Sequence, residues 1–327
     1  MDFVAIGDTT VDEFIRLKDA SVNCDVNQQA CTITMKWGDK IPYDFSVRVH
    51  GVGNAANAAV AAARLGLSSG LVSNVGSDHY GKEILASFKR EGVDTRFIAV
   101  NDSLSTNHHY VLWYDSERTI LIRHEAYPYF IPADFAPPKW IYLSSAGERS
   151  EAFHDELATW LTAHPDTKLA FQPGTFQMAM GRERLAALYA ATELVACNKE
   201  EAERILKLPE TPIKELLEKM RALGPRLVLI TDGPSGAYSY GGERMLFVPM
   251  YPDPKPPYER TGAGDAMTST VTIALALGKP LEEALLWGPV NAMSVVQDIG
   301  AQKGLLTQDA LETYLAEAPS GYAVTTL

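Results

Sequence analysis

The sequence predicts an α/β fold in which helices cover both faces of a mostly parallel sheet. From Trp140 onward, short apolar runs alternate with stretches of helical spacing, which is the pattern of successive β-α units. The predicted strands are 141–144, 168–171, 194–197 and 227–231, and the predicted helices are 151–163, 182–191, 199–206 and 213–223. Ligands of such folds bind beyond the carboxyl ends of the strands, so motifs at those ends matter most.

The amino-terminal part predicts additional β-α elements and a second, smaller sheet. Residues 3–7 predict a buried strand, 53–65 an alanine-rich helix, 70–75 a strand and 80–91 an amphipathic helix. Residues 108–114 and 118–124 have strand composition and flank Asp115-Ser116-Glu117, which predicts a hairpin. With one edge strand predicted at 31–37, the segments 13–47 and 101–125 form the small sheet. The main domain then comprises 1–12, 48–100 and 126–327.

The most informative motif is Thr261-Gly262-Ala263-Gly264-Asp265, which precedes an apolar, alanine-rich run of helical spacing. Small residues allow backbone amides to approach a ligand, and the start of a helix presents unpaired N–H groups that favour an anion. An aspartate beside such a site is poorly placed to bind the anion and well placed to take a proton. The motif therefore suggests phosphoryl transfer to a hydroxyl. A tight loop in which the aspartate only caps the helix is the alternative interpretation of the same sequence.

Two further motifs directly follow predicted strands. Asn198 and Glu201 lie three residues apart at a helix start, where an amide and a carboxylate suit outer-shell binding of Mg²⁺ near phosphates. The same two residues also match a helix capping box, and both roles are compatible. In 231–236, Gly233 and Gly236 would let the backbone reach a nucleotide and Thr231 could donate to a phosphate; a plain turn is the alternative.

The acceptor side is indicated by Asp8 and Asp12 after the first strand and by Gly53 and Asn57 at a helix start. Carboxylates accept hydrogen bonds from adjacent sugar hydroxyls, and Asn57 can both donate and accept. A solvated loop acid and a helix start with small packing residues remain the alternatives. The run 51–56 also fits the dinucleotide pattern G-x-G-x-x-A, but residues 47–50 make a weak first strand.

With these residues assembled, the chain resembles the ribokinase-like (PfkB-type) family of sugar and nucleoside kinases nearly end to end. The resemblance implies the family's three-layer α/β/α fold, with the small sheet as a lid over the sugar. It makes Asp265 the catalytic base and the amides of Gly262, Ala263 and Gly264 the anion hole. It assigns ATP to Thr231, Gly233, Gly236, Asn198 and Asn291, the sugar to Asp12, Gly53 and Asn57, and Mg²⁺, through water, to Glu201 and Asn198.

Three positions depart from the family pattern. Val52 replaces the first of two paired glycines on the sugar side. Glu259 replaces a frequent aspartate near the monovalent-cation site of many members, which leaves potassium activation open. Gln172, in Gln172-Pro173-Gly174, replaces the aspartate of a common Asp-Pro-Asn and removes a charge near the phosphates.

The whole chain limits partners and location. Its formal net charge of −12 argues against nucleic acid but not against ATP, whose phosphates are met locally. No apolar run approaches a membrane span, and residues 1–7 predict a strand rather than a signal peptide. Cys24, Cys31 and Cys197 lack C-x-x-C spacing and predict reduced thiols in a cytoplasmic protein. The adjacent His108 and His109 would point to opposite faces of a strand, so we assign them to the lid or surface.

We therefore expect an ATP-dependent kinase that phosphorylates a primary hydroxyl of a sugar of the ribose, fructose or 2-keto-3-deoxygluconate type. A nucleoside kinase is the alternative, with the base stacked under lid aromatics such as Tyr110, Trp113 or Tyr114. More distant alternatives are a non-catalytic sugar or nucleotide sensor and a dehydrogenase that binds NAD. An exposed lid sheet would also permit a homodimer.

Overall fold

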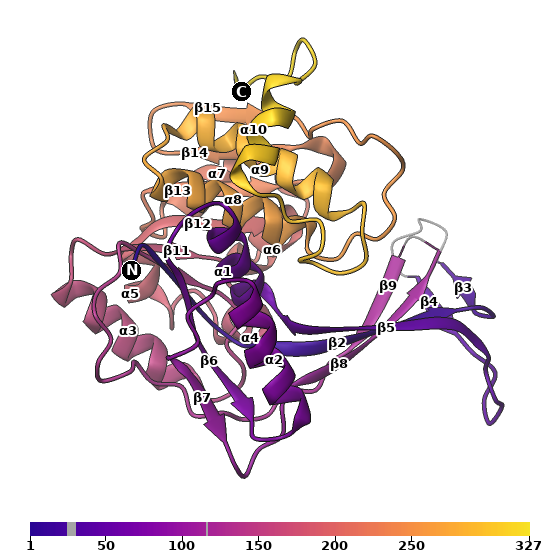
Figure 1. Cartoon of the computed structure of the whole chain (residues 1–327). Coiled ribbons are helices and arrows are strands. Elements are labelled where there is room, and N and C mark those ends of the chain that lie inside the picture. Colours follow the sequence, from indigo (N-terminus) through magenta and orange to yellow (C-terminus); the bar gives the residue numbers. More distant parts are fainter. Residues whose placement is uncertain (25–30, 116) are drawn as a thin grey trace.

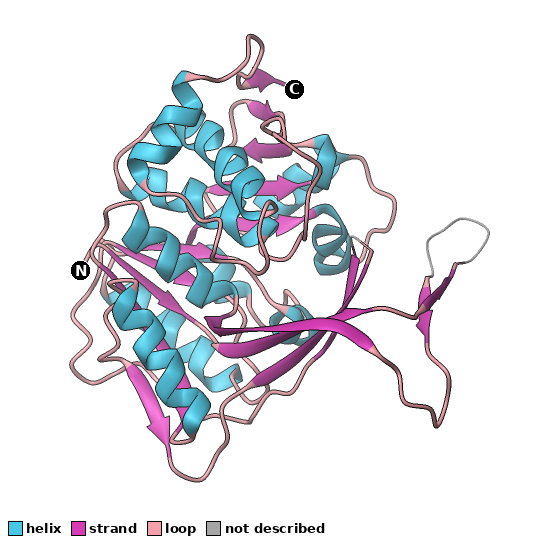
Figure 2. Ribbon diagram, turned by 45° about the vertical axis from the view of Figure 1, so that its right-hand side comes forward, coloured by secondary structure: helices cyan, strands magenta, loops and turns pink. Residues whose placement is uncertain are grey.

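The computed structural model describes residues 1–24, 31–115 and 117–327. A large central sheet lies between two layers of helices, and a small sheet projects from one side (Figures 1 and 2). In order across the central sheet, the strands are β16 (Thr325–Thr326), β15 (Met245–Val248), β14 (Ala237–Tyr240), β13 (Leu227–Thr231), β12 (Thr192–Asn198), β11 (Lys168–Phe171), β10 (Trp140–Leu143), β1 (Phe3–Ile6), β6 (Ser69–Gly76) and β7 (Ile98–Asn101). From β13 to β7 all neighbours are parallel, whereas β14, β15 and β16 extend the sheet with antiparallel pairs.

Each face of the sheet builds its own hydrophobic core, because successive side chains of a strand point to opposite faces. In β1, Phe3 and Ala5 belong to one core, and Val4 and Ile6 belong to the other. The first core is covered by α1 (Asn54–Arg64), α2 (His79–Arg90), α8 (Ala263–Ala276), α9 (Leu281–Val295) and α10 (Gln308–Ala316). The second is covered by α3 (Glu151–Ala163), α4 (Thr175–Met180), α5 (Ala186–Ala190), α6 (Lys199–Leu206) and α7 (Ile213–Arg221). The predicted three-layer fold is confirmed.

Helix α8 is held firmly because it is buried on nearly all sides. Its residues from Ala266 to Ala274 are buried, and it packs against both α1 and α9. The alanines of α1, such as Ala58 and Ala62, are fully buried and permit this close approach. The first turn of α8, which carries Asp265, is therefore fixed relative to the carboxyl ends of the strands.

The small sheet has the order β5 (Tyr43–Val52), β2 (Thr10–Leu17), β8 (His108–Tyr114) and β9 (Glu117–Leu121). β2 pairs antiparallel with β5 and parallel with β8, and β8 with β9 forms the predicted hairpin. Beyond it lies a separate hairpin of β3 (Ser21–Asn23) and β4 (Thr32–Thr34), so the edge strand predicted at 31–37 is shorter than expected (Figure 1). Residues 25–30 of the expected small sheet and the expected turn residue Ser116 lie outside the described residues. The division into a main domain and a lid stays a prediction.

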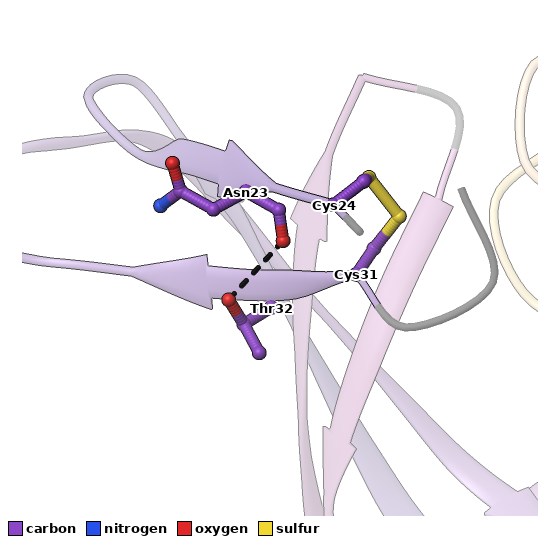
Figure 3. The surroundings of a disulfide bond; sticks show 4 residues. All are labelled: Asn23, Cys24, Cys31 and Thr32. Carbon is purple, nitrogen blue, oxygen red and sulfur yellow. Dashed lines mark hydrogen bonds between the residues drawn. A yellow bond between two sulfur atoms is a disulfide. The ribbon is translucent and has the colours of Figure 1, made fainter. Parts of the chain in front are cut away.

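The prediction of three reduced thiols is wrong for two of them, because Cys24 and Cys31 form a disulfide (Figure 3). In the antiparallel hairpin Asn23 pairs with Thr32, so the two cysteines lie directly opposite each other with their Cα atoms 4.0 Å apart. Cys197 is a free, buried thiol. The spacing of seven residues does not reveal this pairing unless the hairpin between the cysteines is known. Since disulfides are rare in the cytosol, the cysteines give no support to the expected cytoplasmic location.

The dinucleotide pattern at 51–56 begins within the last two residues of β5, a strand of the small sheet. A Rossmann turn must instead follow the first strand of a parallel βαβ unit, so the structure gives no basis for the dehydrogenase alternative. Among the helices within the described ranges, none has both the length and the apolar character needed to cross a bilayer.

Candidate active site

A cavity of about 450 Å³ lies at the carboxyl ends of five neighbouring parallel strands. The residues at or just beyond the ends of β1, β10, β11, β12 and β13 all line it, namely Asp8, Ser145, Gln172, Asn198 and Thr231. The small sheet and the starts of α1, α4 and α8 also line it. A second cavity of about 410 Å³ shares Thr231, Arg260 and Gly264 with the first. The two cavities therefore meet at the first turn of α8.

The start of α8 has the features of an anion-binding site. Gly262 is the N-cap in a left-handed conformation with φ 83°, and a Cβ there would collide with Ala301. A Cβ at Gly264 would meet nothing within 4 Å, so its backbone is open to a ligand. The N–H groups of a first helical turn have no intrahelical acceptors and lie at the positive end of the helix dipole. The Ala263 amide makes one long bond, 3.4 Å, to the Arg260 carbonyl.

Asp265 lies in that first turn and its carboxylate is held by two amide side chains. Asn57 Nδ2 donates to Oδ2 at 2.9 Å, and Gln172 Nε2 donates to Oδ1 at 3.1 Å. Gln302 Nε2 in turn donates to Asn57 Oδ1 at 3.0 Å. Burial raises the pKa of Asp265 above the usual aspartate range, and the hydrogen bonds from Asn57 and Gln172 partly oppose that rise. The result is a partly buried carboxylate that lines the first cavity, next to Gly264, which lines both cavities.

Asn57 lies where the sequence predicts it, but its side-chain amide is already engaged. Both its oxygen and its nitrogen bond to protein groups, which makes it a residue that positions Asp265. Gly53 has φ 118°, and a Cβ there would lie 2.8 Å from the carbonyl oxygen of Asp8. Glycine is therefore required at 53 so that the start of α1 can approach the loop after β1.

Gln172 contacts Asp265 directly, which the sequence does not predict. Tyr142 Oη donates to Gln172 Oε1 at 2.5 Å, which leaves the amide nitrogen facing Asp265. Thr268 Oγ1 lies 2.9 Å from the same tyrosine oxygen. The sequence shows only that an aspartate of the family is replaced by an amide at this position. The contact between the Gln172 amide and Asp265, the predicted base, depends on how β11 is placed relative to α8.

Asn198 and Glu201 form the capping box that the sequence allows. Asn198 Oδ1 accepts from the Glu201 amide at 2.8 Å, and Glu201 Oε2 accepts from the Asn198 amide at 2.9 Å. Both residues also line the first cavity. Burial raises the pKa of Glu201. Because only one oxygen of Glu201 is used in the cap, the other is free to bind a hydrated cation, which fits an outer-shell magnesium ligand.

Thr231, Gly233 and Gly236 line the second cavity together, as the nucleotide-loop prediction requires. Gly233 and Gly236 have φ 50° and 100°, which favours glycine at both positions. Apolar side chains including Met293 and Val296 complete the wall. Asn291 does not join them: it is fully buried, donates to Thr270 Oγ1 and accepts from the Leu306 amide. The structure thus places Asn291 in the packing between α8, α9 and the loop before α10.

At the small-sheet end of the cavity lie Asp12, Asp8, His109 and His124. Asp12 is on β2 rather than in a loop, and its Oδ1 is buried with no hydrogen bond to any described residue, although His109 Nδ1 lies 3.2 Å away. His124 Nδ1 contacts Asp8 Oδ2 at 3.0 Å, and the two imidazoles meet Nε2 to Nε2 at 3.1 Å. From the sequence, His109 is assigned only to the lid or surface, and its contacts with Asp12 and His124 are not predicted. Alternation along a strand indicates that His108 and His109 point to opposite faces, but it does not indicate which of them faces the cavity.

Arg118 and Glu259 meet beside the anion-binding turn. Glu259 is 1% exposed and accepts hydrogen bonds from the Thr261 amide and hydroxyl at 2.8 and 2.5 Å. Arg118 Nε, from β9, lies 3.8 Å from Glu259 Oε1 and has no hydrogen-bond partner in the part of the chain that the structure describes. The Glu259 carboxylate therefore shapes the loop before α8.

The lid aromatics named for base stacking do not line either cavity. Trp113 is buried against Phe45 and Tyr258, and Tyr110 packs against His108 on the outer side. Apolar contact inside the first cavity comes instead from Ile120, Ile122 and Phe176.

Comparison with known proteins agrees with this geometry. The model of the pfkB family carbohydrate kinases matches residues 20–308. A ribokinase of Bacillus subtilis is 29% identical over 277 residues, covering 81% of this chain and 87% of that protein. A nucleoside kinase of Methanocaldococcus jannaschii is 27% identical over 292 residues, covering 81% and 85%. The structure of Arabidopsis thaliana ribokinase complexed with ribose and ATP has the same fold, with a TM-score of 0.80, 20% identity and coverage of 96% and 98%. This chain belongs to the pfkB family of carbohydrate kinases.

Proposed function

We propose that the enzyme transfers the γ-phosphoryl group of ATP to a primary hydroxyl of a sugar or nucleoside, with Asp265 as general base. One observation carries the proposal: a partly buried carboxylate lies at an open helix N-terminus, beside the place where a cavity of about 410 Å³ meets the cavity lined by Asp12 and Gly53. The second cavity would hold ATP against Thr231, Gly233 and Gly236. The first would hold the acceptor against Asp12 and Gly53.

In the proposed reaction Asp265 accepts the proton of the acceptor hydroxyl as the hydroxyl oxygen attacks the γ-phosphorus in line, and the bond from the γ-phosphorus to the bridging β-phosphate oxygen breaks to release ADP. The amides of Gly262, Ala263 and Gly264 stabilise charge on the transferring phosphoryl oxygens. Mg²⁺, when bound near Glu201 and Asn198, would neutralise part of the phosphate charge. Closure of the small sheet over the acceptor would exclude water and suppress ATP hydrolysis.

The acceptor class is tested by measuring ATP consumption with ribose, fructose, 2-keto-3-deoxygluconate, adenosine and cytidine. Phosphorylation of any of these at a primary hydroxyl supports the kinase proposal. A nucleoside kinase is the second candidate, because Ile120, Ile122 and Phe176 offer a base an apolar wall inside the cavity. If no acceptor consumes ATP and a sugar only raises the melting temperature, the chain is a sensor on this scaffold.

We expect Glu201→Gln to raise the Mg²⁺ concentration needed for half-maximal rate by about tenfold. Glutamine can still accept from the Asn198 amide, so the capping box and the melting temperature are expected to persist. The measurement is the initial rate as a function of Mg²⁺ at fixed ATP. Glu200→Gln, in the same turn but exposed, is the control. An unchanged Mg²⁺ dependence in Glu201→Gln would remove this residue from the magnesium site.

We also expect a homodimer formed through the small sheet. Leu121 on β9 and its cross-strand partner Tyr110 are 53% and 45% exposed, an apolar pair that a second copy could cover. Leu121→Glu is expected to shift the sedimentation coefficient to that of a monomer. Val100→Glu on β7 changes an equally exposed residue of the main sheet and should leave assembly unchanged. A wild-type protein that sediments as a monomer would contradict the expectation.

A further inference from the structure

The small-sheet end of the first cavity holds two carboxylates joined by two histidines. Asp8 is bonded to His124, His124 to His109, and His109 lies beside Asp12. Asp8 and Asp12 are 5% and 8% exposed, and all four side chains line the cavity. Tyr129 Oη donates to the remaining oxygen of Asp8 at 2.6 Å. This cluster contains no lysine or arginine.

The contact between the two rings limits the positive charge of the cluster. His109 Nε2 and His124 Nε2 are 3.1 Å apart, so only one of these two nitrogens can carry a proton. Protons on both would bring two N–H groups into direct contact. The histidines can therefore carry at most one positive charge between them. Asp8 accepts from both Tyr129 and His124, as an ionised carboxylate does, and Asp12 adds a second negative charge. The net charge of the cluster is then −1 or −2.

Two arginines, Arg118 and Arg260, also line this cavity. Arg118 approaches Glu259 at 3.8 Å, and Arg260 approaches Glu117 at 3.6 Å, both next to the turn that starts α8. In the proposed reaction that region receives the phosphoryl group of ATP. The other two acids that line the cavity are Asp265 and Glu201. They do not offset the negative charges of Asp8 and Asp12.

We propose that this cluster selects an uncharged, hydroxyl-bearing acceptor and excludes acceptors that carry a carboxylate or phosphate. The inference rests on the proposed function and narrows its acceptor class. Asp12 Oδ1 is buried with no hydrogen bond among the described residues, although His109 Nδ1 lies 3.2 Å away, and a ligand hydroxyl can donate to this carboxylate. A carboxylate or phosphate oxygen offers only lone pairs and brings a like charge. At an effective dielectric constant of about 20, like charges about 6 Å apart reduce affinity by about a hundredfold.

The test compares acceptors that differ in one charged group: ribose with ribonate, and fructose with fructose 6-phosphate, with 2-keto-3-deoxygluconate as a further acid. We expect kcat/KM for each neutral sugar to exceed that of its anionic counterpart by about a hundredfold or more. Calorimetry of the same acceptors without ATP gives a second readout. Asp8→Asn removes one negative charge at nearly constant shape and should lower the neutral-to-anionic preference by about tenfold.

Glu13→Gln is the matched control, because Glu13 neighbours Asp12 on β2 but pairs with Arg48 outside the cavity. It should leave the preference unchanged. Anionic acceptors that react or bind within tenfold of their neutral partners would overturn the inference and leave the kinase proposal intact. If neutral sugars bind in preference to anions but none is phosphorylated, the inference stands and the kinase proposal fails. A preference unaltered by Asp8→Asn would show that this cluster is not its source.

Discussion

Replacing Asp265 by asparagine is expected to lower kcat by about a thousandfold or more while leaving the ATP dissociation constant within about threefold. The asparagine has nearly the same shape, so the start of α8 and its amides stay in place. It cannot accept the proton of the attacking hydroxyl, and proton acceptance is the role we propose for this carboxylate. The measurements are steady-state kinetics with the best acceptor of the panel and calorimetric titration with ATP.

Asp309→Asn is the matched control for this substitution. Asp309 also lies in the first turn of a helix, α10, but it lines neither cavity. Its replacement removes an acid that interacts favourably with a helix dipole and should affect stability slightly and turnover not at all. Near-normal turnover in Asp265→Asn would reject the general-base assignment, and a loss of ATP binding would show that the substitution disturbed the anion-binding turn.

The location of the site could be predicted from the sequence because residues that follow successive parallel strands lie close together in the fold. Gln172, Asn198 and Thr231 are far apart in sequence, but each follows a parallel strand, and parallel strands end at the same edge of a sheet. The residues of the TGAGD motif meet them because α8 packs over that sheet. Predicting α/β alternation was therefore enough to bring the phosphate-side candidates together.

The details that escaped prediction depend on side-chain direction and on the register of the small sheet. Whether His109 or His108 faces the cavity is decided by how β8 pairs with β2. The bond between Gln172 and Asp265 requires the amide to be oriented by Tyr142, which lies 30 residues away in sequence. Asn291 directly precedes Ala292 and Met293, which line the second cavity, yet its hydrogen bonds to Thr270 and Leu306 hold it in the core. Motif spacing carries none of this information.

The second large effect is expected in the pH profile when Gln172 is replaced. Activity requires ionised Asp265, so kcat/KM should fall as the pH falls through the pKa of this group, which burial already raises. In Gln172→Glu one carboxylate oxygen can still accept from Tyr142, while the other would face Asp265 Oδ1 across the present 3.1 Å contact. Two carboxylates at that distance share a proton, which raises the apparent pKa of the pair. We expect the acidic limb of the pH profile to move upward by about one to two pH units.

Gln172→Met separates the lost hydrogen bond from the added charge. Methionine has a similar size and no donor, so it removes only the bond that lowers the pKa of Asp265. The limb should then lie between those of the wild type and Gln172→Glu, and the rate at high pH should recover more fully in both variants than in Asp265→Asn. An acidic limb that stays in place in both variants would mean that the group titrating in the profile is not Asp265. The replacement of the family's aspartate by Gln172 has the opposite consequence in the native enzyme: it leaves Asp265 as the one carboxylate at this contact, and so keeps it available as a base at lower pH.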